Sequence, residues 1–393
     1  MNLQIPEYVS ILMKKLNKNG YECFIVGGAI RSILLNRPVH DYDLTTNALP
    51  EETKQVFHSF HTIDTGLQHG TVTVVSNHIP VEITTYRKET AYKDHRHPDQ
   101  VIFTRTIQDD CARRDFTINA LCYNQDTGLL DFFHGKEDLD NQIIRCIGNP
   151  YERFDEDALR ILRAIRFASQ LNFSIEEETS KAILDTKETL SYVSIERIQE
   201  EFTKYLEGDG FLPLLYPYRK VFSIFLPEFN EIKEWDSLIQ HFQHSINNAY
   251  VRLAILFSCF QNPKHTLKQL KYSNKEITTV TEMISHKESP ISNRIEIKKL
   301  LKELSCDFEL YLKFREAMDI KSYDQIYDIY QSIIQNHECY SLKQLEINGS
   351  DLVSLGYQGK QISETLNHAL NNVIEEKLPN QKEVLLKQIK DCH

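Results

Sequence analysis

The segment from Cys23 to Thr45 constrains the fold of this chain more than any other. Its first four residues, Cys23–Val26, are apolar and predict a buried strand that ends at the pair Gly27-Gly28, after which a helical stretch begins. Bare backbone N–H groups at the start of a helix suit a phosphate, so both glycines are candidate nucleotide-binding residues. A strand that leads directly into a helix predicts a unit in which helices pack on a sheet.

Two carboxylates close the same segment, at Asp41 and Asp43. Residues two apart on a strand share a face, where two carboxylates repel each other unless a cation lies between them. Their hard oxygen ligands suit Mg²⁺. A phosphate cradle beside a metal-binding pair is what nucleotidyl transfer needs, with two metals that activate the attacking hydroxyl and hold the triphosphate. The alternative for this pair is an exposed turn.

A third carboxylate, Glu82, lies in the predicted strand Val81–Tyr86. A carboxylate in an apolar strand is costly unless it is paired or bound to a metal, so Glu82 is a candidate catalytic residue. The alternative is a solvent-facing position on an edge strand. Arg31 follows Gly28 by three residues, near the first helical turn, and is a candidate ligand for a triphosphate; the alternative is a surface arginine.

Two further clusters combine arginines with carboxylates. In the run from Arg113 to Ala120, two guanidiniums beside a carboxylate and an amide offer phosphate and ribose contacts, and Arg114 is the candidate nucleotide-binding residue. In the predicted helix Glu156–Leu171, Asp157 and Arg160 are three apart and share a face, where they form either an ordinary ion pair or a base-reading pair. In the second case Asp157 accepts from the exocyclic amine of cytosine or adenine, and Arg160 donates to the adjacent ring nitrogen. Arg163 and Arg166 continue at the same spacing and drift by about 60° per step. Arg166 is therefore expected to meet phosphate, RNA or a neighbouring domain.

The composition is that of an ordinary soluble protein, with 393 residues of which 41% are hydrophobic and 26% charged. No apolar run approaches the roughly 20 residues that span a bilayer, so no membrane partner is expected. The eight scattered cysteines, without a CxxC motif, favour a reducing cytoplasm over a disulfide or zinc framework. The net charge of −11 argues mildly against a nucleic-acid partner. Lysines nevertheless cluster in 264–275 and 298–302, either as solvated helix faces or as an RNA-backbone footprint.

Strand and helix patterns divide the chain near residue 149. Before it, the candidate strands are Cys23–Val26, Tyr42–Thr45, Thr71–Val75, Val81–Tyr86, Val101–Phe103 and Leu129–Phe133, and the candidate helices are Glu7–Lys18, Ala29–Leu35 and Glu51–Phe57. After it, helical periodicity runs to the C-terminus, most clearly in Glu156–Leu171, Ile175–Thr186, Ile195–Glu207, Ala249–Phe260, Ile295–Leu304, Tyr323–Asn336 and Gly359–Glu376.

Taken together, these clusters resemble the class II nucleotidyltransferases, and more closely the bacterial CCA-adding tRNA nucleotidyltransferases of the firmicute type. The matching motifs are GGAIRSILLNRPVHDYDLTT, VEITTYR, RRDFTINAL, DFFHGKEDL, EDALRILRAIRFA, SIERIQEEF and, near the end, INGSDLVSLGYQGKQISETL. The resemblance implies an α+β protein: a polymerase β-like nucleotidyltransferase head (1–148) of mixed sheet and helices, then an all-α neck (149–208), body (209–330) and tail (331–393).

The same resemblance implies the ligands and partners. Mg²⁺ is expected on Asp41 and Asp43, with Glu82 as the matching third carboxylate. The tRNA 3′ end is the expected acceptor, held along the helical part, and a homodimer is weakly implied. The residues implied to bind the incoming CTP or ATP are Gly28, Arg31, Arg114, Asp157, Arg160, Arg163 and Arg166. One departure is Ser32, where the family usually has Asp.

Activities differ within the family, so the resemblance leaves several open. C-only enzymes tend to lack a flexible loop that is intact here as Arg87–Gln100, which argues against a C-only enzyme. Full CCA addition is the expected activity; the alternatives are an A-adding or poly(A) enzyme on the same scaffold and, more remotely, a non-catalytic RNA-binding protein. His40-Asp41 is the only His-Asp pair and lies inside the transferase motif, so no additional phosphohydrolase is expected.

Overall fold

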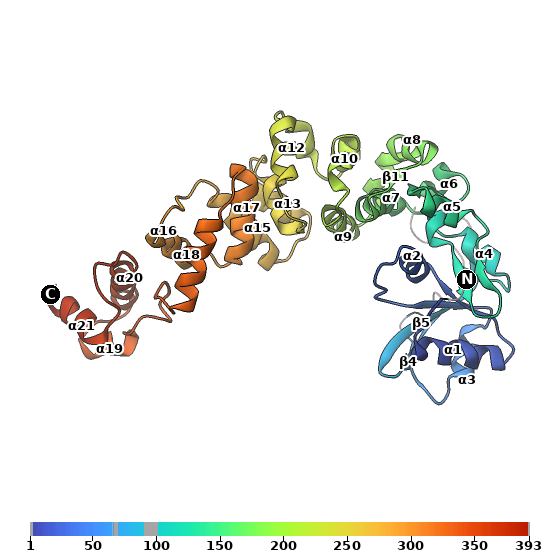
Figure 1. Ribbon diagram of the computed structural model, residues 1–393, viewed down its shortest axis with the longest axis horizontal. Coiled ribbons are helices and arrows are strands. Elements are labelled where there is room, and N and C mark those ends of the chain that lie inside the picture. Colours follow the sequence, from blue (N-terminus) through green and yellow to red (C-terminus); the bar gives the residue numbers. More distant parts are fainter. Residues whose placement is uncertain (1–2, 65, 67–69, 90–100, 392–393) are drawn as a thin grey trace. The chain divides into compact units, whose positions relative to one another are not determined.

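The computed structural model describes residues 3–64, 66, 70–89 and 101–391. The chain forms two compact units, Met1–Glu231 and Ile232–His393 (Figure 1). The first contains a mixed sheet, its flanking helices and every predicted site residue. The second is helical throughout its described residues.

A seven-stranded sheet organises the first part of unit 1. Within it β2 and β5 run parallel, and the other neighbouring strands are antiparallel. In spatial order the strands are β3 (His61–Ile63), β4 (Thr71–Ser76), β5 (Ile79–Thr85), β2 (Asp43–Thr46), β1 (Cys23–Val26), β8 (Cys122–Asn124) and β9 (Gly128–Leu130). The short strand pairs are β6 (Arg87–Glu89) with β7 (Val101–Phe103), and β10 (Ile143–Ile144) with β11 (Ser174–Ile175). The helices of this part are α1 (Glu7–Lys18), α2 (Gly28–Leu34), α3 (Pro50–Val56), α4 (Ile107–Ala112), α5 (Gly135–Asp140) and the 3₁₀ turn η2 (Thr117–Asn119).

Both faces of β1 are buried, because its side chains alternate between two cores. Cys23 and Ile25 join the core that contains residues of α1 and α3, which lie side by side in Figure 1. Phe24 and Val26 join a second core together with Cys111 of α4. This two-sided burial explains why β1 is apolar throughout, as the sequence predicted.

The rest of unit 1 is a helical bundle in which α7 packs on α9 and α6 packs on α8. Its elements are α6 (Pro150–Glu156), α7 (Leu159–Leu171), α8 (Glu177–Thr186), η3 (Lys187–Tyr192), α9 (Ile195–Leu206), α10 (Phe211–Leu215), α11 (Arg219–Phe222) and η4 (Pro227–Glu231). Unit 2 consists of α12 (Trp235–Gln243), α13 (Ala249–Phe257), α14 (Pro263–Gln269), α15 (Asn274–Ser285), α16 (Arg294–Glu303), α17 (Phe308–Asp319), α18 (Asp324–Gln335), α19 (Gly349–Ser354), α20 (Lys360–Ile374) and α21 (Lys382–Asp391).

Unit 2 is built around α13, whose side chains are buried almost all round and pack against α12, α15 and α17. A helix that is apolar on every side must lie inside its domain. Helices α19, α20 and α21 form a separate core of their own. Across the described residues, no helix combines the length and apolar character that crossing a membrane requires.

The predicted α+β class is confirmed, with two local corrections. The strand predicted over Leu129–Phe133 ends at Leu130, because the Asp131 carboxylate accepts hydrogen bonds from the backbone N–H groups of Gly135 and Lys136 and starts a turn into α5. The helix predicted from Glu156 begins only at Leu159. Of the predicted flexible loop Arg87–Gln100, residues 90–100 lie outside the described part of the chain, and Arg87–Glu89 form β6.

The two lysine clusters differ in the structure. The lysines of 264–275 are exposed, which fits either alternative. In the second cluster, Lys298 is buried and its ammonium lies 2.6 Å from Glu338, while Lys299 pairs with Glu375 at 2.7 Å. Lys302 donates to Asn371 at 2.7 Å. These contacts hold α16 to the segment after α18 and to the C-terminal end of α20, so this cluster has a structural role.

Candidate functional site

The carboxylates of Asp43 and Glu82 come together because β2 and β5 are parallel neighbours. Leu44 pairs with Ile83 in this ladder, and both side chains belong to the core beneath α1 and α3. Asp43 and Glu82 each precede one of these core residues, so both carboxylates lie on the opposite face. Asp41 is exposed in the loop just before β2, so the prediction that Asp41 and Asp43 share a face of one strand is wrong. Asp43 and Glu82 therefore lie on one face of the sheet, on two of its interior strands, with Asp41 in the adjoining loop.

The Asp43 carboxylate is influenced by the charges of Glu82, Asp41 and Arg114. Partial burial raises the pKa of Asp43, the charges of Glu82 and Asp41 raise it further, and the guanidinium of Arg114 opposes the shift. An oxygen-only donor set of this kind fits a hard divalent cation such as Mg²⁺. Within the described residues, no group of three or more Asp, Glu, His or Cys side chains forms a complete metal site. A Mg²⁺ ion held by two carboxylates commonly completes its shell with water and substrate phosphates.

Gly27 lies between the sheet and the guanidinium of Arg114. Its backbone has φ +66° and ψ −126°, a conformation that residues with a Cβ rarely adopt. A Cβ placed there would lie 3.3 Å from Nη1 of Arg114. Gly27 therefore permits both the turn from β1 into α2 and the close approach of Arg114. The sequence predicted only that its backbone N–H group is open to a phosphate.

We expect Gly27→Ala to impair nucleotide addition, because it strains the turn by about 1–3 kcal/mol and displaces Arg114. Gly128→Ala is the matched control: Gly128 has φ +76°, and a Cβ at this residue would meet no atom within 4 Å beyond its chain neighbours. Both variants should lose thermal stability, but only Gly27→Ala should raise KM for CTP and ATP. Equal kinetic effects of the two substitutions would contradict the role assigned to Gly27.

Arg114 is held in place by Asp110, a fully buried residue of α4. The Asp110 carboxylate accepts from Nη2 of Arg114 at 3.2 Å and from Nη2 of Arg113 at 2.8 Å. Burial alone would raise the pKa of Asp110, but the two guanidiniums hold it below its ordinary value. The predicted Arg113-Arg114 pair is thus anchored on one carboxylate that the sequence did not single out.

Asp115 and Asn119 connect the sheet unit to α7. The buried Asp115 carboxylate accepts from Nε of Arg163 at 2.8 Å and from the amide of Asn119 at 2.9 Å. The Asn119 side-chain oxygen in turn accepts from Arg31 of α2. Burial would raise the pKa of Asp115, but Arg163 and the hydrogen bond from Asn119 hold it well below its usual range. This relay brings Arg31 and Arg163 together, although they are far apart in the sequence.

Arg31, Arg163 and Arg166 meet on the ring of Phe167. Their Cζ atoms lie 4.8, 5.4 and 4.1 Å from the ring centroid. Nε of Arg166 also lies 2.7 Å from the Glu201 carboxylate of α9. Burial, together with the charges of Arg166 and Arg163, lowers the pKa of Arg31 to about 10, although Asp115 acts in the opposite direction. Three neighbouring guanidiniums repel one another, and a bound polyanion would relieve this repulsion through charge-assisted hydrogen bonds.

Asp157 and Arg160 do not form the helical pair that their spacing predicted. Asp157 lies between α6 and α7 with extended backbone angles, and its carboxylate accepts from the backbone N–H of Leu159 at 3.1 Å. This capping contact starts α7 after Asp157 and so explains the later helix start. The second carboxylate oxygen lies 3.3 Å from Arg197 of α9. Arg160 is buried and donates to Glu156 at 2.6 Å.

Sequence reasoning missed the residues that hold the predicted site in place. They are Asp110, Asp115, Asn119, Phe167 and Glu201. Asp115 and Asn119 belong to the Arg113–Ala120 run, which was predicted to contact ligand. In the structure they bind the side chains of Arg163 and Arg31. The sequence does contain a pattern that could have predicted such an anchor: Asp110 precedes Arg113 by three residues and Arg114 by four, the spacings at which opposite charges pair on a helix.

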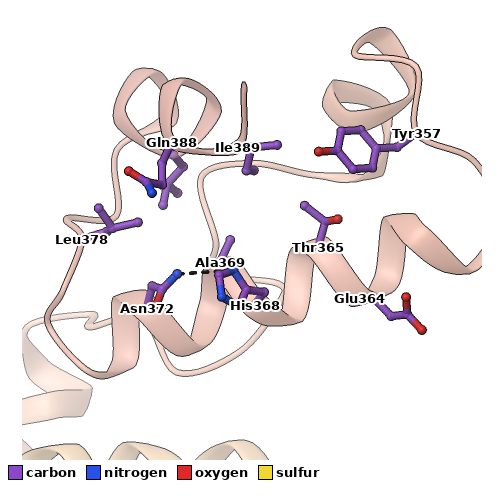
Figure 2. A pocket seen from close by; sticks show the side chains of 10 residues that line it. Tyr357, Glu364, Thr365, His368, Ala369, Asn372, Leu378, Gln388 and Ile389 are labelled. Atoms are coloured by element: carbon purple, nitrogen blue, oxygen red, sulfur yellow. Dashed lines mark hydrogen bonds between the residues drawn. The ribbon is translucent and has the colours of Figure 1, made fainter. Parts of the chain in front are cut away.

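A separate pocket of about 290 Å³ lies between α20 and α21 in unit 2 (Figure 2). Ala369, Leu378 and Ile389 provide apolar walls, and His368 and Asn372 lie side by side on α20. None of the predicted site residues lines this pocket.

Comparison with known proteins places these features in a family. Residues 23–145 match the poly A polymerase head domain, residues 172–232 match a family described as "Probable RNA and SrmB- binding site of polymerase A", and residues 240–389 match domain 2 of tRNA nucleotidyltransferases. The CCA-adding enzyme of Enterococcus faecalis is 36% identical over 397 residues, which covers 95% of this chain and 93% of the relative. The chain belongs to the CCA-adding enzyme family. The CCA-adding enzyme of Pediococcus pentosaceus is 34% identical over 96% of both chains.

Solved CCA-adding enzymes share the fold over the full chain. The Bacillus stearothermophilus CCA-adding enzyme, determined in complex with CTP, has a TM-score of 0.83 and 26% identity and covers 99% of this chain and 98% of its own. The Thermotoga maritima CCA-adding enzyme complexed with tRNA has a TM-score of 0.67 at 19% identity over 99% and 97% of the two chains, which shows the fold. The predicted resemblance is confirmed, and as a CCA-adding family member the chain is a tRNA nucleotidyltransferase. The four-part division and the homodimer remain predictions.

Proposed function

We propose that this chain completes tRNA 3′ ends in the cytoplasm by adding C, C and A from CTP and ATP, without a nucleic-acid template, with release of pyrophosphate. The observation that carries the proposal is the approach of Arg114, which contacts Gly27, to the sheet face that carries Asp43 and Glu82. The carboxylate pair and the cluster of Arg31, Arg163 and Arg166 belong to the same compact unit, which supports the proposal. The full-length likeness to CCA-adding enzymes favours CCA addition over A addition and over a non-catalytic RNA-binding role.

Asp41 and Asp43 would hold Mg²⁺, with Glu82 as the neighbouring third carboxylate. When bound, the metal ions would lower the pKa of the tRNA 3′-hydroxyl and neutralise charge on the leaving pyrophosphate. Glu82 and Asp43 each precede the paired residues Ile83 and Leu44, and the charge of Glu82 acts on Asp43. Glu82 would therefore strengthen the attraction of this face for a divalent cation. The charge of Arg114 acts on Asp43, so Arg114 would orient the negative triphosphate toward this face of the sheet.

The arginine cluster would bind the triphosphate. Arg31, Arg163 and Arg166 converge from α2 and α7, and Asp115 and Glu201 are their carboxylate partners. Guanidiniums form charge-assisted, two-pronged hydrogen bonds with phosphate oxygens, so they hold the nucleotide in one orientation. An incoming triphosphate would also relieve the repulsion that lowers the pKa of Arg31.

Asp157 and Arg160 would read the base. Cytosine and adenine each present an amine donor beside a ring-nitrogen acceptor, which an Asp acceptor and an Arg donor match. Guanine and uracil present the opposite pattern and would leave these groups unpaired, which strongly disfavours binding. Arg197 of α9 holds the side chain of Asp157, and Glu156 of α6 holds the side chain of Arg160.

We expect Asp157→Asn to relax base choice, because the amide can donate as well as accept. Incorporation of UTP and GTP relative to CTP and ATP should rise by about 10-fold or more, since discrimination by one hydrogen-bonding pair is worth about 1–3 kcal/mol. The measurement is single-nucleotide extension of tRNA with each NTP. Asp185→Asn is the control, since Asp185 is an acidic residue that accepts from Tyr151 elsewhere in the same bundle. An unchanged ratio among the four NTPs would contradict the assignment.

The proposed function is tested with three tRNA transcripts that end before CCA, after C and after CC. Each is incubated with single NTPs and with CTP plus ATP, in Mg²⁺. Growth of all three transcripts to one CCA end is the expected result. Extension of the CC-ended transcript alone would identify an A-adding enzyme, and repeated addition of A would identify a poly(A) enzyme. Tight tRNA binding without incorporation of any NTP would refute the catalytic proposal.

A further inference from the structure

The ring of Phe167 is the shared contact of three arginines that come from two elements. Arg31 reaches it from α2, while Arg163 and Arg166 reach it from α7. Phe167 is only 6% exposed and lies at the centre of the cluster. The ring of Phe116 meets it edge-on, with centroids 5.8 Å apart and planes at 81°, so the ring has little freedom to turn.

Among the described residues, fewer carboxylates than guanidiniums form ion pairs around Phe167. Three guanidiniums contact the ring, whereas the carboxylates that pair with them are Asp115 and Glu201. An aromatic face attracts cations through its quadrupole but carries no formal charge. A ring can therefore hold the arginines close together while it leaves their positive charge available to an anion, whereas a third carboxylate would neutralise it.

The anchoring of Phe116 links the ring to the rest of the site. The backbone N–H of Phe116 donates to the Asp115 carboxylate at 2.8 Å, and Asp115 also accepts from Arg163. The ring that fixes Phe167 and the carboxylate that fixes Arg163 thus belong to adjacent residues. The position of Phe167 is defined by the same buried connection that joins η2 to α7.

We propose that Phe167 is a positioning residue that holds Arg31, Arg163 and Arg166 together for the triphosphate of either nucleotide. This inference rests on the proposed function, in which these arginines bind the triphosphate. Phe167 acts through the arginines and has no part in choosing the base. Its loss should therefore affect CTP and ATP by the same factor.

The test compares Phe167→Leu, which keeps apolar bulk but removes the aromatic face, with Phe167→Tyr, which retains it. Phe167→Leu should raise KM for CTP and for ATP by about 10-fold each, with a much smaller change in kcat and an unchanged preference between them. Phe167→Tyr should restore KM to near the wild-type value. Phe167→Met serves as a second non-aromatic variant if the leucine variant does not fold.

Phe202→Leu is the matched control for lost packing. Phe202 is a buried residue of α9 in the same bundle, and its ring packs against Tyr205, Phe222 and Phe225. It should lose thermal stability comparably to Phe167→Leu while its KM values stay near wild type. Equal KM changes in the two leucine variants, or a rise in KM in Phe167→Tyr equal to that in Phe167→Leu, would overturn the proposal.

Binding of inorganic tripolyphosphate to the full chain, measured by calorimetry, distinguishes a failure of the role of Phe167 from a failure of the proposed function. Phe167→Leu should weaken tripolyphosphate binding by the same factor as KM. If the wild-type chain adds nucleotides and binds tripolyphosphate, but Phe167→Leu binds it equally well, the role of Phe167 is refuted while the function stands. If the wild-type chain binds neither CTP nor tripolyphosphate, the proposed function fails, and the role of Phe167 fails with it.

Discussion

Replacing Asp43 by Asn is expected to lower the rate of nucleotide addition by at least about 1000-fold. Loss of a metal-binding carboxylate removes several kcal/mol of transition-state stabilisation, and each 1.4 kcal/mol corresponds to about a factor of ten. The measurement is single-turnover addition of C to a tRNA transcript. Asp126→Asn is the control, because Asp126 is an exposed acidic residue of the same unit. A variant at Asp43 that retains near-normal rate would refute the metal assignment.

The same substitution should leave thermal stability unchanged or raised at neutral pH without divalent cations. Burial and the charges of Glu82 and Asp41 raise the pKa of Asp43 in the folded state. A raised pKa means that the favourable contribution of this group is present below its unfolded-state pKa and is lost as pH rises through the folded-state value. At neutral pH the ionised group therefore opposes folding, and Asn removes the repulsion. The difference in Tm should vanish as pH falls and Asp43 becomes protonated.

Replacing Asp115 by Ala is expected to produce the largest loss of stability among these variants, about 3–5 kcal/mol, because it removes the buried carboxylate with which the partly buried Arg163 is paired. Asp115 is 8% exposed and contacts Arg163, Asn119 and the backbone of Phe116. Unfolding of the full chain by urea, followed at the transition of the sheet-containing unit, measures the effect. Asp64→Asn is the control, since it removes an exposed ion pair with Lys54 that should contribute little.

The Asp115 effect should depend on pH with the opposite sign to that of Asp43. Neighbouring guanidiniums hold the pKa of Asp115 well below its usual range in the folded state. Its stabilising contribution is fully present above the unfolded-state pKa of about 4 and is lost as pH falls through the folded value. The wild-type advantage over Asp115→Asn should be constant near neutral pH and shrink in acid below about pH 4. An advantage that does not change with pH would show that Asp115 stabilises by shape rather than by charge.

Local patterns predicted the elements of this protein well where burial is regular. The strand Cys23–Val26 and the helix Glu7–Lys18 were predicted with their observed bounds. Every residue of this strand is apolar and buried, and the buried apolar residues of the helix recur along one of its faces. The short strands β8 and β10 escaped prediction, since two or three residues carry too little periodicity. The late start of α7 was also missed, because the Asp157 side chain caps the helix locally and overrides the spacing pattern.

The sequence by itself determined the family and the glycine turn before α2, because their motifs consist of residues a few positions apart. The pairing of Asp41 with Asp43 on a metal remains a prediction. Only the tertiary structure decided that Glu82 lies beside Asp43 and that Arg31 shares the Phe167 ring with Arg163. Strand order and helix packing bring these residues together across long stretches of chain, and no local period encodes such contacts. The tertiary structure also showed which carboxylates anchor arginines, because burial and pairing depend on every element around them.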